Sequence, residues 1–120
     1  MEDSPVTKWF EDLKRIWLEK DISALKHILA DRCEYYEDPF LPALTTWEEI
    51  ETAWQEVREQ DIKELEISVL IDGQTEGSAM YDFVFIDKLG KRYESKGSYY
   101  LKLDQTGRAR EFRQWWTVQT

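Results

Sequence analysis

The first half of the chain carries apolar side chains at intervals of three and four residues, which is the spacing of amphipathic helices. Ser4 followed by Pro5 indicates a helix start, because serine caps free backbone amides and proline fits the first helical position. The apolar face of this first helix comprises Val6, Trp9, Phe10, Leu13, Ile16 and Trp17. Asp21 precedes a shorter helix, whose apolar face comprises Ile22, Leu25, Ile28 and Leu29. A third helix is predicted after Thr46, which forms a capping box with Glu49, and its apolar stripe comprises Trp47, Ile50, Trp54 and Val57.

Two other parts of the sequence are typical of strands. Residues 33–37 form a short predicted strand between the second and third helices, and Asp38-Pro39 ends it because proline lacks a backbone donor. From residue 64 onwards apolar and polar residues alternate, which is the period of strands that bury one face. Four strands are predicted there, over residues 64–71, 79–87, 93–103 and 109–118.

The loop at residues 88–90 determines which faces of two neighbouring strands coincide. A three-residue loop with Gly90 as the bulge residue pairs odd positions with odd positions, whereas a two-residue loop pairs odd with even. We prefer the three-residue loop because it gives one continuous aromatic face. That face comprises Tyr81, Phe83 and Phe85 of one strand and Tyr93, Gly97, Tyr99 and Leu101 of the next.

Two aromatic doublets, Tyr99-Tyr100 and Trp115-Trp116, place large rings on both faces of the last two strands, because neighbouring strand residues point to opposite faces. One face is expected to pack against the helices. The other is either exposed or covered by a second copy of the chain, and we infer a homodimer through the outer face of the sheet. The alternative is that one ring of each doublet lies at a strand end beneath the N-terminal helix.

The order of elements resembles that of the nuclear transport factor 2-like (NTF2-like) superfamily, which includes the SnoaL-like and ketosteroid isomerase-like proteins. Residues 20–31 resemble the second helix of the family, residues 36–40 its first strand, residues 46–50 the start of its third helix, and residues 103–108 its last hairpin. The resemblance implies an α+β fold in one domain spanning residues 1–120. Three helices are expected to pack on a strongly curved mixed or antiparallel sheet and to enclose a cone-shaped pocket.

Composition agrees with a small folded domain and excludes several partners. The chain has 120 residues and a formal net charge of −9, with 18 acidic against 8 basic residues before position 67, which argues against a nucleic-acid partner. No apolar run approaches the roughly 20 residues of a membrane helix, so no membrane association is expected. Cys33 is the only cysteine, so no internal disulfide is expected, and a cytoplasmic location is the default. Aromatic residues make up 14% of the chain, a surplus that points to a pocket, an interface or both.

The resemblance also implies candidate catalytic residues. Asp38 matches the aspartate that acts as a base next to a carbonyl in the isomerase-like proteins, and apolar surroundings would raise its pKa. The tyrosine that stabilises the enolate in those enzymes falls on Leu13, which cannot donate a hydrogen bond. Their second acid falls on Tyr99, which can donate one. Asp38 and Tyr99 are therefore the predicted catalytic pair.

Strand alternation is expected to place Glu34, Tyr36 and Asp38 on the pocket side and Glu37 on the opposite side. The ligand-binding residues of the pocket are expected to be Tyr36, Trp54, Tyr81, Phe83, Phe112, Gln114 and Trp116. His27 is the only histidine and falls opposite the apolar face of the second helix, so it is expected in solvent. No residue pattern indicates a metal site or a cofactor.

Two functional hypotheses follow from the sequence. In the first, the chain binds a small apolar or aromatic molecule in the cone, and as an enzyme it is of the isomerase or lyase type, with a pocket aspartate transferring a proton. In the second, aromatic side chains fill the cone, and the domain is a non-catalytic dimerisation or protein-interaction module. Cavity volume separates the two, because an open pocket of roughly 300 Å³ or more favours ligand binding.

Overall fold

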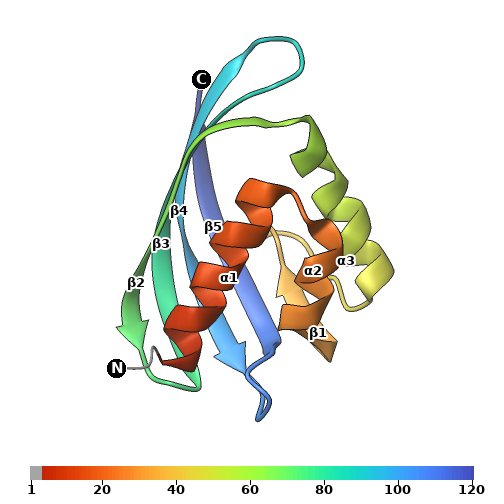
Figure 1. Cartoon of the computed structure of the whole chain (residues 1–120), viewed down its shortest axis with the longest axis vertical. Helices are drawn as coiled ribbons and strands as arrows, with labels where there is room; N and C mark the ends of the chain where they lie inside the picture. The colour runs from red at the N-terminus through yellow and green to blue at the C-terminus, as the bar shows by residue number, and fades with distance from the viewer. Residues whose placement is uncertain (1–3) are drawn as a thin grey trace.

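A computed structural model of the chain describes residues 4–120 and contains the predicted order of helices and strands (Figure 1). The helical elements are α1 (Pro5–Glu19), α2 (Ile22–Leu25), α3 (Trp47–Trp54) and the 3-10 turns η1 (Lys26–Ile28) and η2 (Gln55–Glu59). The strands are β1 (Leu29–Tyr36), β2 (Asp61–Asp72), β3 (Glu76–Ile86), β4 (Arg92–Leu103) and β5 (Ala109–Gln119).

The starts of α1 and α3 follow the predicted capping residues. The Ser4 side chain accepts a hydrogen bond from the backbone N–H of Thr7, and Pro5 is the first helical residue. At the start of α3, Thr46 and Glu49 form the predicted capping box, in which each side chain accepts the other residue's backbone N–H. Both caps pair amides that have no partner within the helix, so the two helices begin where the sequence places them.

The five strands form one mixed sheet in the order β1-β5-β4-β3-β2. β1 runs parallel to β5, and every other neighbouring pair is antiparallel. The long strands curve around α1, which lies across one face of the sheet, and α2 and α3 lie on the β1 side of α1 (Figure 1). The fold is therefore α+β, with three helices on a curved mixed sheet.

β3 and β4 pair in the register that the three-residue loop predicts. Tyr81 lies opposite Gly97, Phe83 opposite Ser95, and Gly90 has a positive φ of 86°. Odd-numbered residues of both strands therefore share the face that meets α1, as expected.

The apolar face of α1 supplies much of the core. All six residues predicted for this face are buried, from Val6 at 0% to Trp17 at 8% exposed. Rings of this helix contact rings of the sheet, with centroids 5.3 Å apart for Trp9 and Phe112 and 6.0 Å apart for Phe10 and Tyr99. Such pairs contribute about 0.5–1.5 kcal/mol each beyond simple burial. Part of the aromatic surplus therefore belongs to the core.

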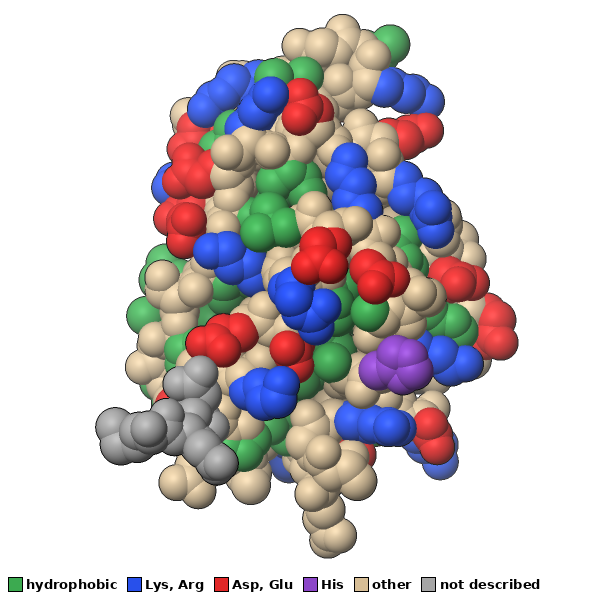
Figure 2. All heavy atoms as spheres, in the orientation of Figure 1, with side chains coloured by type: hydrophobic (Ala, Val, Ile, Leu, Met, Phe, Trp, Pro, Cys, Tyr) green, Lys and Arg blue, Asp and Glu red, His purple; other side chains and the backbone are tan. Residues whose placement is uncertain are grey.

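The solvent-facing side of α1 carries acidic and basic side chains interspersed with one another (Figure 2). Asp12 lies 3.2 Å from the Lys8 ammonium and 3.6 Å from the Arg15 guanidinium. His27 is exposed, as the helical geometry predicts. Within residues 4–120 no helix combines the length and the apolar character that crossing a membrane requires.

Candidate active site and ligand cavity

Two adjoining cavities lie between the helices and the sheet. The inner chamber, with a volume of about 80 Å³, is lined by residues of α1, β1, α3, η2, β4 and β5. The outer groove, with a volume of about 270 Å³, lies at the mouth and continues along β3. The two cavities share the lining residues Trp17, Glu37, Glu56, Gln60 and Gln114. The deep part of the cone is thus narrow, and most of its open space lies at the mouth.

All predicted site residues except Tyr36 line one of these cavities. Those of the inner chamber are Trp54, Tyr99 and Phe112, those of the outer groove are Asp38, Tyr81, Phe83 and Trp116, and Gln114 lines both. Leu13, at the position of the enolate-stabilising tyrosine, lines the inner chamber. The chamber is narrow because large rings fill its walls, including Tyr99 and Phe112 with centroids 5.0 Å apart.

The predicted orientation of β1 is wrong. Tyr35, not Tyr36, faces the core, where its ring stacks on Phe112 at 5.0 Å and its hydroxyl accepts a hydrogen bond of 2.9 Å from the Trp54 indole. Tyr36 lies on the outer face, with the Arg113 guanidinium 4.0 Å from the centre of its ring. The prediction extended strand alternation to Asp38, but β1 ends at Tyr36.

Glu37 and Asp38 both line the outer groove, because strand alternation has ended before them. The Asp38 carboxylate accepts the backbone N–H of Phe40 at 2.8 Å, which fixes a turn at the end of β1. Partial burial raises the pKa of Glu37 above its ordinary value, and the negative charges of Glu56 and Asp38 raise it further. Glu37 is a candidate that sequence reasoning missed, although the strand-breaking Pro39 is a signal that alternation stops nearby.

The Tyr99 hydroxyl is the deepest candidate polar group. The residue is 2% exposed, and its ring stacks on Tyr81 at 4.8 Å. Among residues 4–120 the hydroxyl has no hydrogen-bond partner, and it is not sealed off from open space, so it faces the inner chamber. Burial holds the pKa of Tyr99 well above its ordinary value, and the neighbouring phenols of Tyr81 and Tyr35 add to this, so the group stays a neutral donor.

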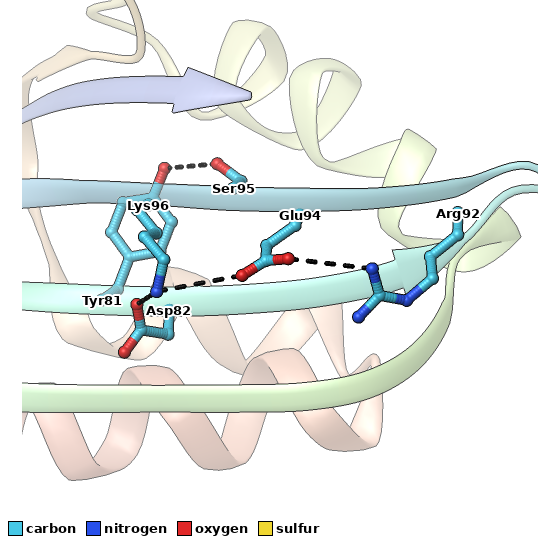
Figure 3. Close-up of polar contacts among 6 residues, drawn as sticks. All are labelled: Tyr81, Asp82, Arg92, Glu94, Ser95 and Lys96. Carbon is cyan, nitrogen blue, oxygen red and sulfur yellow. Dashed lines mark hydrogen bonds and ion pairs between the residues drawn. The ribbon is translucent and has the colours of Figure 1, made fainter. Parts of the chain in front are cut away.

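The neighbouring Tyr81 is fully paired. Its hydroxyl lies 3.0 Å from Ser95 Oγ (Figure 3) and accepts a longer bond of 3.4 Å from the Gln114 amide. On the opposite face of the same strands, Lys96 joins Asp82 at 2.6 Å and Glu94 at 3.9 Å (Figure 3). These ion pairs belong to the outer face of the sheet and point away from both cavities.

The residues that the structure describes form neither a metal site nor an activated thiol. No group of three or more metal-ligating side chains comes together within residues 4–120. Burial raises the pKa of the Cys33 thiol to about 12, and the negative charges of Glu34 and Glu111 contribute, so the thiolate nucleophile is not populated at neutral pH.

No protein-family profile matches the chain, and no curated protein matches it by sequence. Solved structures do match in fold. A Δ5-3-ketosteroid isomerase from Mycobacterium sp. is 13% identical, with a TM-score of 0.81 over 98% of this chain and 100% of that chain. A computationally designed 17-OHP binder is 14% identical, with a TM-score of 0.81 over 98% and 99%. A Mycobacterium tuberculosis protein in complex with estradiol-17β-hemisuccinate is 13% identical, with a TM-score of 0.77 over 98% and 100%.

The chain therefore has the NTF2-like fold, and the resemblance predicted from its motifs is confirmed at the level of fold. Structural neighbours with this fold also include an NTF2-like protein from Burkholderia thailandensis and an LEH-like epoxide hydrolase from Mycobacterium tuberculosis.

Proposed function

We propose that the chain binds a small, largely apolar or aromatic molecule, whose body lies in the outer groove and whose end reaches the inner chamber. The observation that carries this proposal is the Tyr99 side chain, which is 2% exposed and whose hydroxyl has no hydrogen-bond partner within residues 4–120 and opens onto the inner chamber. Because this oxygen is accessible from the chamber, its partner can come from outside the described chain. A polar atom of a bound ligand would supply that partner.

The volumes limit the size of this molecule. Three structural neighbours are a ketosteroid isomerase, a designed 17-OHP binder and a protein in complex with an estradiol derivative. An inner chamber of about 80 Å³ is too narrow for a steroid ring system to enter, because the rings of Trp54 and Phe112 occupy its walls. We therefore expect a ligand of only one or two rings, because the groove of about 270 Å³ is slightly smaller than the roughly 300 Å³ at which an open pocket favours ligand binding.

Tryptophan indole N–H resonances give a direct test by nuclear magnetic resonance. One- and two-ring phenols and ketones are titrated into the protein, with assignment by single tryptophan-to-phenylalanine variants. We expect the resonances of Trp17 and Trp54, which line the inner chamber, to shift. Trp115, exposed on the outer face, is the internal control. If no compound moves Trp17 or Trp54, the second hypothesis, a domain with a filled cone and no small-molecule ligand, takes its place.

As chemistry, we propose proton transfer next to a carbonyl, with Tyr99 as the hydrogen-bond donor to the carbonyl oxygen. Asp38 is the base that the resemblance implies, and Glu37 is the base that the geometry favours, because it lines both cavities and burial raises its pKa. The proton would pass from carbon to the carboxylate and back to carbon, so the reaction is an isomerisation or an exchange.

Deuterium exchange at the α-carbons of 2-tetralone in D₂O measures this activity. Removing a positioned base lowers such rates about 100-fold or more. A loss of that size in Glu37→Gln, but not in Asp38→Asn, assigns the base to Glu37, and the reverse result assigns it to Asp38. Exchange no faster than in buffer contradicts the catalytic proposal and leaves a binding protein.

We also propose that a second copy covers the outer face of the sheet. Met80, 51% exposed, and Trp115, 43% exposed, flank Ser98 in one row across β3, β4 and β5. The ion pairs beside this row carry both signs of charge, so the patch can face itself in a two-fold interface (Figure 3). Light scattering should show a dimer that Trp115→Glu converts to a monomer, and a monomeric wild-type chain contradicts the proposal. A cytoplasmic location and a single domain over 1–120 stay predictions from the sequence.

A further inference from the structure

We propose that the molecule bound in the cone is a cation, an aromatic or alicyclic amine whose ammonium group lies at the mouth between Glu37 and Glu56. This inference rests on the ligand-binding part of the proposed function and adds the charge of the ligand to it. It replaces the role of Glu37 as a base, because a carboxylate paired with an ammonium group has a lowered pKa. Its apolar body would lie along the aromatic wall of the outer groove, and its far end would reach Tyr99 in the inner chamber.

The mouth of the cone is acidic and has no countercharge of its own. Glu37, Asp38 and Glu56 all line the outer groove, and no lysine, arginine or histidine among residues 4–120 lines either cavity. Two of these carboxylates, those of Glu37 and Glu56, make no hydrogen bond or ion pair with any described residue. The third carboxylate, that of Asp38, already accepts a hydrogen bond from the backbone N–H of Phe40.

Some acidic side chains elsewhere on the surface have a basic neighbour, which this pair lacks. Asp12 has two basic neighbours within 3.6 Å, and Glu59, in the same 3-10 turn as Glu56, lies 3.5 Å from the Lys88 ammonium. The negative charge of Glu56 also raises the pKa of Glu37, a repulsion that a bound ammonium group would reverse. Lack of a basic partner is not unique to this pair, but Glu37 and Glu56 combine it with a place on the lining of both cavities, which leaves the cone mouth negative.

The second, independent observation is the unpartnered Tyr99 hydroxyl, in a residue 2% exposed, which faces the same inner chamber that Glu37 and Glu56 line. One ligand can satisfy both features if it carries an ammonium group at one end and a polar atom at the other. Trp17 and Trp116 also line the outer groove, and a tryptophan ring whose face meets the ammonium group would attract it by its quadrupole. A net charge of −9 adds long-range attraction for cations.

Three probes of the same shape test the charge: tyramine, the neutral 4-ethylphenol and the anionic 3-(4-hydroxyphenyl)propionate. Each keeps the phenol that can reach Tyr99 and differs only at the mouth. Dissociation constants come from the Trp17 and Trp54 indole resonances at low and high salt. We expect tyramine to bind about 10-fold or more tighter than 4-ethylphenol, the order of a charge-assisted hydrogen bond. The preference should shrink in high salt, and the anion should bind weakest.

Glutamine variants test which residues bind the ammonium group of the ligand. Glu37→Gln and Glu56→Gln should each lower the preference for tyramine several-fold and leave 4-ethylphenol binding unchanged. Glu51→Gln, on the exposed side of α3 and outside both cavities, is the matched control and should change nothing.

The possible failures are distinguishable. Equal or tighter binding of 4-ethylphenol overturns the charge inference and leaves the proposed function standing. A tyramine preference that survives in both glutamine variants overturns the assignment of the ammonium site to this pair. If none of the three probes moves the Trp17 and Trp54 resonances, both the ligand-binding proposal and the charge inference fall.

Discussion

Tyr81 and Tyr99 form a matched pair in which the same substitution should have opposite consequences. Their rings stack at 4.8 Å with an angle of 15° between planes, and both residues are buried. The Tyr81 hydroxyl is bonded to Ser95, whose exposed fraction is 6%. The Tyr99 hydroxyl has no partner within residues 4–120. Replacing either residue by phenylalanine removes one oxygen and leaves the ring stack in place.

The hydrogen bonds of the two hydroxyls determine how much each substitution should change stability and ligand affinity. Tyr81→Phe loses a bond with a net value of about 1 kcal/mol and leaves a buried serine hydroxyl unpaired. We expect the free energy of unfolding to fall by about 1–2 kcal/mol, or roughly 4–8 °C in Tm for a domain of this size. Tyr99→Phe loses no bond, so its Tm should equal or exceed that of the wild type. Its affinity for 4-ethylphenol should fall about 5-fold, which is about 1 kcal/mol.

Thermal unfolding followed by circular dichroism measures the first quantity, and titration of the indole resonances measures the second. A fall in Tm for Tyr99→Phe as large as that for Tyr81→Phe would show that the Tyr99 hydroxyl stabilises the fold. An unchanged affinity for the phenol in Tyr99→Phe would show that the ligand does not reach the inner chamber. Either result refutes the role assigned to this hydroxyl.

Two further predictions concern stability. A Cβ at Gly97 would lie 2.0 Å from a backbone oxygen of β5 and 2.8 Å from the Tyr81 ring. Gly97→Ala should therefore lower the free energy of unfolding, measured in urea, by about 3 kcal/mol, whereas the neighbouring Ser98→Ala should lower it by about 0.5 kcal/mol or less. A smaller loss for Gly97→Ala than for Ser98→Ala contradicts the close packing at Gly97. Because the pKa of Glu37 is raised in the folded state, the folded chain holds this proton more tightly than the unfolded chain and ionisation opposes folding. Glu37→Gln should therefore raise Tm at pH 7, and the gain should vanish as the pH falls below about 4, the ordinary range of a glutamate. A lower Tm at pH 7 would reveal a stabilising contact of Glu37.

The elements that the sequence predicts well are those governed by local chemistry. Ser4 with Pro5 and Thr46 with Glu49 define helix starts through caps that involve only nearby amides. Gly90 defines the β3–β4 register, because its positive φ permits the three-residue loop. The concave and convex faces of both strands follow from that single residue.

The orientation of β1 was predicted wrongly because it depends on where a strand ends. Counting back from Asp38 by twos assigns Tyr36 to the pocket, but the alternation holds only while the chain remains extended. Tyr35 faces the core because it stacks on Phe112 and accepts a bond from Trp54, residues far away in the sequence. No local pattern distinguishes Tyr35 from Tyr36, since both are tyrosines in a short strand.

The volume and the acidity of the cone have separate origins, and neither is visible in composition. Ser95 and Gly97 are small where the concave face of β4 meets the rings of Phe83 and Tyr81, so the aromatic residues of β3 form a wall instead of a plug. The end of β1 before Pro39 then turns Glu37 toward this wall. Enlarging Ser95 should close the groove without changing its charge, whereas neutralising Glu37 should change the charge without closing it. Space and charge at this site are therefore independent, so each can be tested while the other is kept.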